Sequence, residues 1–352
     1  MAALKDIANA AGVSVGTVSR ILNQGRAHLY SEETRRRVLE VSRQVGYRPN
    51  RFAQAMRLRK TRIVGFASVS VEPEGYLQSY TVYPFIVGLS QQLALEGYHV
   101  ALVECSDLGD QTEPDRPWSI RDQFFDGLVV HYGLADRATR FAANVGVPLV
   151  WWDSGVFEPT GCIYRDESEV GRQVTRRLIE LGHRRIGYIV GRRGWQDYND
   201  HRPMHYSYAQ RYESYRDEMR AHGLTEVPMV GYEATSLARQ LTEQKITAVI
   251  TQGGSLAPLD VVLGQLGWRV PEDLSVASLD REARILPRGV RVGGMLNDRH
   301  EVGRQAARMA LAVLEHGKES APSVRYVGEF DLGDTIGPPR TEMSHASISR
   351  IV

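Results

Sequence analysis

The feature that most constrains the fold is a pair of short helical patterns on either side of Gly12. Ile7 and Ala11 lie four residues apart and share one helical face, so they can pack inward together. Gly12 supplies the backbone freedom of a tight turn, and Ser14 is a candidate N-cap for a second helix. The pattern predicts a helix–turn–helix. Its spacing alone leaves open whether the unit reads DNA or is a plain helical hairpin.

The second helix of this unit presents two different faces. Val18, Ile21 and Leu22 are expected to point to the core. The side chains left outward, on the part of a recognition helix that contacts base edges in a major groove, are Val15, Gly16, Thr17, Ser19 and Arg20.

Charge is distributed unevenly along the chain. Residues 1–62 contain 13 Lys and Arg against 4 Asp and Glu, whereas the remaining residues contain 30 against 38. A basic head on an acidic body indicates that the head meets a polyanion, although a solvated basic face is the simpler alternative. Together with the helix–turn–helix pattern, the asymmetry favours DNA binding.

Length and composition set the class of protein. A chain of 352 residues with 42% hydrophobic and 24% charged residues is expected to form two or three globular domains. It has neither an apolar run of 18 residues nor a secretory signal, so we expect a cytoplasmic protein without a membrane span. Cys105 and Cys162 are interpreted as buried free thiols, which agrees with a reducing compartment.

A third helix and a short basic segment complete the head. The helix is predicted from Ser31 to Val45 and ends at Gly46. Its residues Val38, Leu39 and Val41 are expected to close a three-helix core. The segment after Pro49, residues 50–58, is too short to form a stable helix alone, so it is expected to fold on binding or on pairing with a copy of itself.

From Arg62 onward the pattern changes to alternating strands and helices. Continuous apolar runs separated by helical segments predict parallel sheets covered on both faces. Strands are expected at residues 63–69, 98–103, 127–130, 148–152, 185–190, 229–232, 247–250 and 274–279. Helices are expected at residues 84–96, 137–145, 167–181, 208–222, 259–266 and 299–315. The body is therefore predicted to be α/β, in two halves of similar size.

Several segments resemble the lactose/galactose repressor (LacI/GalR) family of transcriptional regulators. In the head these are Leu4–Ala8, Ala11–Ser14, Thr17–Asn23 and Gly46–Asn50, and in the body Phe125–Leu128, Val147–Val150, Leu178–Ile186 and Gly267–Val276. The resemblance implies an effector domain similar to periplasmic sugar-binding proteins, with two subdomains, a cleft between them and three chain crossings. The implied divisions are a DNA-binding domain (1–49), a hinge helix and linker (50–61), an N-terminal subdomain (62–162 and 293–322), a C-terminal subdomain (163–292 and 323–340) and a disordered tail (341–352).

The resemblance also implies which residues contact DNA. Val15, Gly16 and Arg20 fall on base-reading positions, and Arg20 can make a bidentate contact to guanine. Met56 stands where relatives insert a leucine into the minor groove, with a dimer contact or core position as the alternative. The expected DNA contacts are Val15, Gly16, Thr17, Ser19, Arg20, Asn23, Tyr47, Asn50, Ala53, Met56 and Arg57.

A ligand site is expected at the carboxyl ends of the strands, where parallel α/β domains bind their ligands. The residues placed there by position or by the resemblance are His131, Asp153, Ser207, Arg211, Tyr232, Gly253 and Asp280, with His205 as a weaker candidate. Trp152 and Tyr232 offer flat apolar faces to a sugar or a nucleobase. Simpler alternatives are a helix cap for either aspartate, a structural ion pair for Arg211 and a packing role for His131.

Departures from the family pattern leave the ligand open. Gly253-Gly254 stands where relatives have an Asn-Asp pair, and Asp331–Thr335 replaces an Arg-containing segment. No phosphate loop, metal-ligand spacing or nucleophile motif is present, so no enzyme activity, metal or cofactor is expected. The resemblance implies a homodimer, with a tetramer as the alternative, that represses carbohydrate-utilisation genes from a pseudo-palindromic operator and is released by a small-molecule inducer, a sugar or sugar derivative. The alternatives are a regulator that requires a corepressor, such as a purine, and a solute-binding protein.

Overall fold

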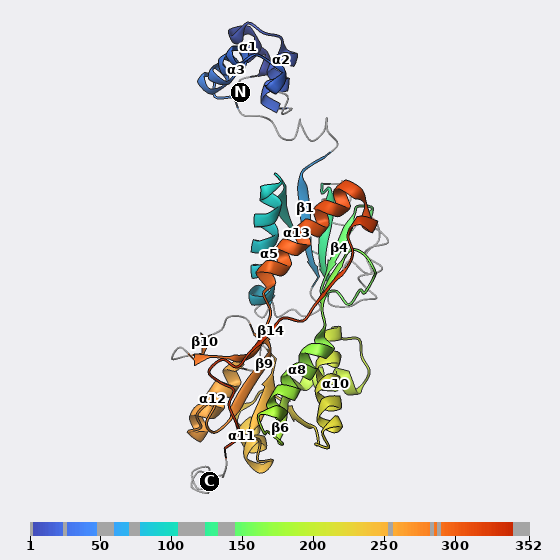
Figure 1. Cartoon of the computed structure of the whole chain (residues 1–352), viewed down its shortest axis with the longest axis vertical. Coiled ribbons are helices and arrows are strands. Elements are labelled where there is room, and N and C mark those ends of the chain that lie inside the picture. The colour runs from blue at the N-terminus through green and yellow to red at the C-terminus, as the bar shows by residue number, and fades with distance from the viewer. Residues whose placement is uncertain are drawn as a thin grey trace. The chain divides into compact units, whose positions relative to one another are not determined.

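The computed structural model describes residues 3–23, 27–47, 60–69, 78–104, 124–132, 145–252, 256–281, 285–286 and 290–340. The chain divides into two compact units, residues 1–62 and 63–352 (Figure 1). The predicted hinge segment, most of the predicted helix at 137–145, Cys105 and the predicted tail lie outside the described residues.

The first unit contains three short helices around a small apolar core. Its elements are α1 (Leu4–Ala11), α2 (Val15–Asn23), a 3-10 turn (Ala27–Leu29) and α3 (Glu32–Gln44). Its buried apolar side chains are Ile7, Ala8, Ala11, Val18, Ile21 and Val38. Gly12 ends α1 at a φ of 62°, a left-handed conformation that glycine adopts without strain. This confirms the predicted helix–turn–helix.

Two helices of this unit, α2 and α3, begin at the serine caps that the sequence predicted. The Ser14 hydroxyl accepts a hydrogen bond from the Thr17 amide at 3.0 Å, and the Ser31 hydroxyl accepts one from the Thr34 amide at 3.3 Å. Two of the predicted orientations were wrong. Leu39 is 44% exposed, and Ser19 is buried at 8% exposure. Because α2 packs against both α1 and α3, it buries a wider stripe than its apolar residues indicate.

The first sheet of the body has the strand order β13-β5-β4-β3-β1-β2, and its neighbouring strands pair in parallel. The strands are β1 (Ile63–Val69), β2 (His99–Glu104), β3 (Gly127–Tyr132), β4 (Leu149–Trp152), β5 (Cys162–Arg165) and β13 (Val324–Tyr326). Two helices, α5 (Gln78–Leu95) and α13 (Arg299–His316), pack together against one face of this sheet. Helix α5 begins six residues before the predicted start and carries Pro84 inside it, so the proline does not mark the first turn.

The second sheet has the order β14-β12-β9-β8-β6-β7 and is parallel except for the β12–β14 pair. Its strands are β6 (Ile186–Val190), β7 (Val227–Val230), β8 (Ala248–Thr251), β9 (Ser275–Arg281), β12 (Gly293–Leu296) and β14 (Glu329–Asp331). Its helices are α8 (Glu167–Glu180), α9 (Arg192–Asn199), α10 (Tyr206–Ala221), α11 (Ala234–Glu243) and α12 (Leu256–Leu266), and a small ribbon joins β10 (Ile285–Leu286) to β11 (Val290–Arg291). Cys162 is buried as a free thiol in the first sheet.

The chain passes between the two sheets three times, as the resemblance implied. The crossings lie between β5 and α8, between β12 and α13, and between β13 and β14. Strand membership moves the predicted subdomain borders, because β5 and β13 belong to the first sheet and β12 belongs to the second. These strands have three or four residues each, too few to show an apolar run. In the described part of the chain, no helix is long and apolar enough to cross a membrane.

Candidate functional sites

The outward face of α2 carries most of the predicted DNA contacts that the structure describes. Val15, Gly16 and Arg20 are exposed and Thr17 is half-buried. Arg20 donates a hydrogen bond from Nη1 to the Tyr30 hydroxyl at 3.3 Å, and this bond lowers the pKa of Tyr30. Tyr30, in the loop before α3, therefore holds the guanidinium of Arg20 on this face.

The remaining predicted DNA contacts divide into two groups. Tyr47 is half-buried and packs against the core of the head, while the side chain of Asn23 lies outside what the structure describes. The hinge candidates Asn50, Ala53, Met56 and Arg57 also lie outside the described residues. Ser19 is buried, which removes it from the exposed reading face.

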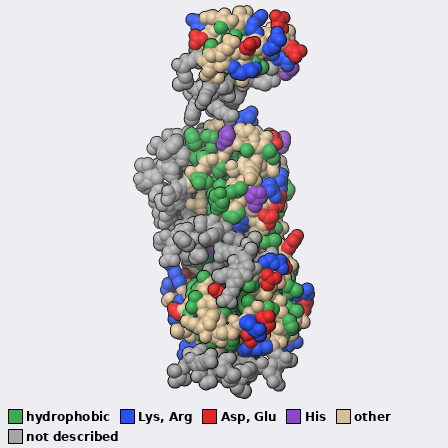
Figure 2. All heavy atoms as spheres, turned by 90° about the vertical axis from the view of Figure 1, so that its left-hand side faces the viewer, with side chains coloured by type: hydrophobic (Ala, Val, Ile, Leu, Met, Phe, Trp, Pro, Cys, Tyr) green, Lys and Arg blue, Asp and Glu red, His purple; other side chains and the backbone are tan. Residues whose placement is uncertain are grey.

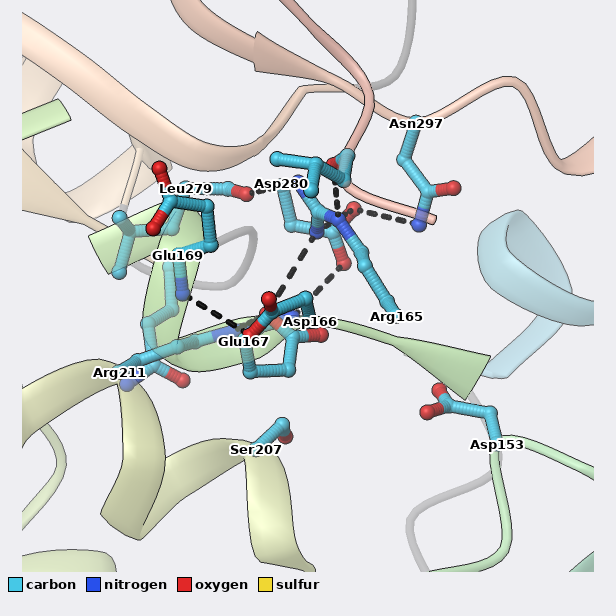
Figure 3. Close-up of polar contacts among 12 residues, drawn as sticks. Asp153, Arg165, Asp166, Glu167, Glu169, Ser207, Arg211, Leu279, Asp280 and Asn297 are labelled. Carbon is cyan, nitrogen blue, oxygen red and sulfur yellow. Dashed lines mark hydrogen bonds and ion pairs between the residues drawn. The ribbon is translucent and has the colours of Figure 1, made fainter. Parts of the chain in front are cut away.

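In the body, polar side chains converge where the chain crosses between the sheets (Figure 3). Arg165, at the end of β5, is 1% exposed. Its Nε donates to the Val327 carbonyl at 3.1 Å in the third crossing, and its Nη2 donates to the Leu279 carbonyl at 2.7 Å in β9. One buried arginine thus joins the first crossing, the third crossing and the second sheet.

Glu167, at the start of α8, holds Arg211 of α10. The Arg211 Nε and Nη2 donate to the two carboxylate oxygens at 2.6 and 2.7 Å, and both side chains are buried. Burial opposes the charge of Arg211, but the adjacent carboxylate raises the pKa of Arg211 well above its usual value. The two helices can approach because Gly171 has no side chain: a Cβ there would lie 2.7 Å from the Arg211 carbonyl oxygen.

Asp280, near the end of β9, accepts from groups on both sides of the junction. Arg299 Nη2, in the first turn of α13, donates to it at 2.5 Å, and Asn297 Nδ2 donates at 3.3 Å. Arg165 Nη1 and Arg211 Nη2 lie 3.5 and 3.8 Å from its oxygens. Burial would raise the pKa of Asp280, but these guanidinium groups hold the pKa well below its usual range.

Asp153 links the end of β4 to the start of α10. Its backbone has a φ of 48°, an uncommon conformation for a residue other than glycine. The Asp153 carboxylate accepts a hydrogen bond from the Tyr206 hydroxyl, and its carbonyl accepts one from His205 Nε2 at 2.9 Å. His205 caps α10, because its Nδ1 accepts from the Ser207 amide at 3.3 Å.

Four polar side chains form a row along the carboxyl edge of the first sheet. Strand register places Ser68, His131 and Trp152 side by side, and Arg165 lies two residues beyond Ile163, the partner of Trp152. Residues two apart on a strand share a face, so all four point to the face covered by α5 and α13. Burial lowers the pKa of His131 to about 4, which leaves this imidazole neutral near pH 7.

Trp152 is packed more deeply than expected. Its ring stacks on Phe85 of α5 with 3.6 Å between ring centroids and lies 4.6 Å from the His131 ring. The side chain is buried, so the prediction that it offers a flat face to a ligand was wrong. The face of the sheet that carries it is covered by α5.

The structure gathers six of the predicted ligand-site residues at this junction: His131, Asp153, His205, Ser207, Arg211 and Asp280. Neither aspartate caps a helix. The structural alternative for Arg211 is correct, because it makes a buried ion pair. Tyr232 follows β7, is 39% exposed and lies beside Gly191, and Gly253 is outside the described residues.

Sequence reasoning missed the other half of the junction. The missed residues are Arg165, Glu167, Tyr206, Asn297 and Arg299. Arg165 directly follows the apolar segment Cys162–Tyr164, and that short strand was the available signal. Among the described residues, no group of three His, Cys, Asp or Glu side chains is placed to hold a metal ion.

Comparison with known proteins agrees with this architecture. Residues 3–50 match the lacI family of bacterial regulatory proteins, and residues 175–336 match the periplasmic binding protein-like domain. The chain belongs to the lacI family, and it is a DNA-binding transcriptional regulator rather than an enzyme.

The relatives span nearly the whole chain. The HTH-type transcriptional repressor PurR of Haemophilus influenzae (strain PittEE) is 25% identical over 337 residues, covering 91% of this chain and 93% of the relative. The ribose operon repressor of Escherichia coli (strain K12) is 28% identical over 300 residues, covering 80% and 83%.

Solved structures share the fold. The Lac repressor bound to ONPG in the repressed state superposes with a TM-score of 0.73 at 20% identity, covering 95% of this chain and 99% of that one. A complex of the transcriptional regulator CelR with cellobiose superposes with a TM-score of 0.59 at 24% identity, covering 96% and 100%.

Proposed function

We propose that the chain is a ligand-responsive repressor of carbohydrate-utilisation genes. It binds a pseudo-palindromic operator as a homodimer and is released when a small molecule binds at the junction of the two sheets. The observation that carries the proposal is the polar junction itself, because its side chains come from all three crossings and from both sheets. A ligand held there acts on the relative positions of the two halves of the body.

The DNA-binding part of the proposal assigns base reading to α2. Val15 and Gly16 contribute apolar contact and close approach, and Arg20 is the hydrogen-bonding reader in each half-site. The basic segment at residues 50–61 is assigned as the hinge that orders in the minor groove between two heads, with Met56 as the inserted side chain. Such a regulator acts on chromosomal DNA, so we place it in the cytoplasm.

The dimer is assigned to the side of the first subdomain formed by α5 and the edge strand β2. Leu95 is 76% exposed, Leu102 is 69% exposed, and Tyr83 on α5 is also exposed. Figure 2 looks at the molecule from the side on which α5 lies in Figure 1 and shows hydrophobic side chains gathered there. Large apolar side chains grouped on one surface are typical of an interaction site, and a second copy supplies a self-complementary partner.

The interface is tested by the mass of the full chain in solution. Leu102→Glu is expected to convert a dimer to a monomer, measured by light scattering after size exclusion. Val261→Glu is the matched control, because Val261 is an exposed apolar residue on α12. A dimer that survives Leu102→Glu and Leu95→Glu together would place the interface elsewhere.

The regulatory function is tested by selecting DNA from a random library with the full chain. An enriched pseudo-palindrome that the chain binds in a gel shift supports the proposal, and so does its release by a sugar. The absence of any enriched sequence at low salt contradicts it, because phosphate contacts are strongest there.

The second candidate function reverses the sign of the ligand. A relative is named the PurR repressor and another the ribose operon repressor, so both nucleobase-like and sugar ligands belong in the test. A ligand that strengthens the gel shift identifies a corepressor. A solute-binding protein is disfavoured because the head matches a family of DNA-binding regulators.

A further inference from the structure

We propose that the loop at residues 153–158 and the start of α10 form a clasp. This noncovalent connection holds the two halves of the body in one arrangement and opens when the regulator switches between its DNA-binding and its released state. The clasp consists of Asp153 and Phe157 from the first half and of His205 and Tyr206 from the second. Its link to DNA binding rests on the proposed function, whereas its existence as a connection between the halves does not.

The polar part of the clasp joins the end of β4 to the start of α10. The Tyr206 hydroxyl donates to the Asp153 carboxylate, and His205 Nε2 donates to the Asp153 carbonyl at 2.9 Å. Partial burial and the charge of Asp153 raise the pKa of Tyr206 well above its usual value. The hydroxyl therefore keeps its proton at neutral pH and remains a donor to Asp153.

The apolar part of the clasp is a row of three rings. Phe157 lies between Tyr164 of β5 and Tyr206 of α10, with its ring centroid 4.8 and 5.1 Å from theirs. The two ring pairs meet at 77° and 89°, which is a favourable edge-to-face geometry. Phe157 is 49% exposed, so its ring is not part of the core of either half. It contacts one ring from each half, which is the placement expected of a residue that joins them.

Each side of the clasp is fixed to its own half of the body. In the first half, the Asp153 amide donates to the Ile163 carbonyl at 2.9 Å, and the Ser154 hydroxyl donates to the Val130 carbonyl at 3.0 Å. In the second half, α10 packs closely against α8. Because both sides are anchored, a relative movement of the halves is not absorbed within either of them. It breaks the clasp as a unit.

The clasp differs in its place along the chain from the buried ion pairs of the junction. Arg165 ends β5 at the first crossing and Arg299 begins α13 at the second, so both make their contacts beside a crossing. Phe157 and Tyr206 belong to no crossing. In Figure 3, Asp153 lies apart from the dashed contacts around Arg165. A contact at a hinge can persist when the hinge turns, whereas a contact away from it has to break, so the clasp is the part that can switch.

The first experiment is hydrogen exchange of the full chain, followed by mass spectrometry, and it needs neither a ligand nor DNA. Tyr206→Phe removes one hydroxyl and keeps the ring. We expect about tenfold faster exchange in the loop at residues 153–158, which does not carry the substitution. Tyr208→Phe is the matched control, because it makes the same change two residues further along α10 and outside the clasp. A change confined to the peptide that carries the substitution would overturn the inference.

A second variant covers the case in which Tyr206→Phe does not fold. Phe157→Ala removes the ring that joins the halves, and the exposure of Phe157 means that no cavity is left in a core. We expect about tenfold faster exchange at the start of α10, in the other half of the body. Wild-type exchange there would contradict the clasp.

The second experiment asks whether the clasp takes part in regulation. On the DNA sequence selected by the full chain, Tyr206→Phe and Phe157→Ala are each expected to change the affinity about fivefold or more, because a contact made in only one of two states shifts their balance. The double variant should change the affinity no more than the larger single variant, since either substitution breaks the same clasp. Wild-type affinity in all three variants would overturn the regulatory role. A wild-type chain that binds no specific DNA would instead contradict the proposed function, and hydrogen exchange would still test the clasp.

Discussion

The reading face of the head and the junction of the body both depend on arginine, but they hold it in opposite ways. Arg20 is exposed and makes one hydrogen bond, to the hydroxyl of Tyr30. Arg165 and Arg211 are buried, and carboxylates and backbone carbonyls surround them. The first arrangement leaves a guanidinium available to an external partner, whereas the second uses the guanidinium to join parts of the same chain.

The exposed arginine of the head and the buried arginines of the junction respond differently to the loss of a partner. An exposed cation in water contributes little to stability and can exchange its partner for a phosphate or a base at small cost. A buried cation that loses its partner is costly, so the junction is expected to change only as a unit. This contrast makes the head a surface for contact and the junction a coupled element between two halves. It also predicts that variants of the two regions act on different measurements.

The largest expected effect is on the stability of the body when one partner of the Arg211–Glu167 pair is removed. Arg211→Met and Glu167→Leu each leave a buried charge without its hydrogen-bonded partner, which costs about 3–5 kcal/mol. The double variant should cost much less than the sum of the two, because it leaves neither charge alone. Urea unfolding followed by tryptophan fluorescence measures this in the body, since all five tryptophans lie after residue 63.

The matched comparison is Arg20→Ala, which should change the free energy of unfolding of the head by less than about 0.5 kcal/mol, followed by circular dichroism because the head contains no tryptophan. If the single variants of the junction were as mild as Arg20→Ala, the pair would not be buried in solution and the contrast between the regions would be lost. Additive losses in the double variant would instead show that the two side chains act separately.

The next effect is acid sensitivity of the body, centred on His131. Its folded pKa is lowered to about 4 by burial, with Asp153 raising it and His205 and Arg299 lowering it further. The unfolded chain therefore binds a proton between about pH 6.5 and 4 that the folded chain does not. The contribution of His131 to the free energy of unfolding is fully present above about pH 6.5. It is lost as the pH falls toward 4, by at most about 3 kcal/mol.

The test is urea unfolding of the full chain between pH 7 and pH 4.5, again followed by tryptophan fluorescence. His131→Gln should remove most of the slope in this range. Below about pH 4 the lowered pKa of Asp280 adds a further loss that His131→Gln leaves in place. A wild-type stability that does not change between pH 7 and 4.5 would show that His131 is solvated rather than buried.

The same contrast explains how much of the structure the sequence could predict. In the head, local rules decide the outcome: the glycine turn, the serine caps and the apolar spacing of Ile7, Val18 and Val38 all agree with the fold. Ser19 was wrong because its burial depends on how α1 and α3 pack around α2, which no local pattern contains.

In the body, the long buried strands were predictable and the junction was not. Strands such as Ile63–Val69 are apolar runs. In contrast, β12, β13 and β14 have three or four residues and can be recognised as strands only once the sheet they join is known. Asp153 follows β4, and Asp280 follows the predicted strand 274–279 and lies near the end of β9, so both could be found by position. Two of the partners of Asp280, Arg165 and Arg211, lie far from it in the sequence and reach it only through the crossings.

A third effect, intermediate in size, concerns the choice of DNA sequence by Arg20. Arg20→Ala is expected to lose about 1–3 kcal/mol of discrimination at one base pair in each half-site, because a bidentate contact to guanine is removed. The measurement is gel-shift affinity for the selected operator and for operators altered at single positions. If Arg20→Ala weakened all these sequences equally, Arg20 would be a phosphate contact instead.

The smallest expected effect tests whether the hydrogen bond to Tyr30 positions Arg20 for DNA binding. Tyr30→Phe removes the hydroxyl that accepts from Arg20 while it keeps the ring that packs against the core of the head. The loss of one hydrogen bond costs about 0.5–1.5 kcal/mol. We expect this loss to appear as weaker discrimination at the base pair that Arg20 reads, with unchanged salt dependence of binding, since no phosphate contact is lost.

In an Arg20→Ala background, Tyr30→Phe should have no further effect on discrimination. A full additional loss there would mean that Tyr30 contacts the DNA itself, and the head would then hold its reading residues independently, unlike the coupled junction.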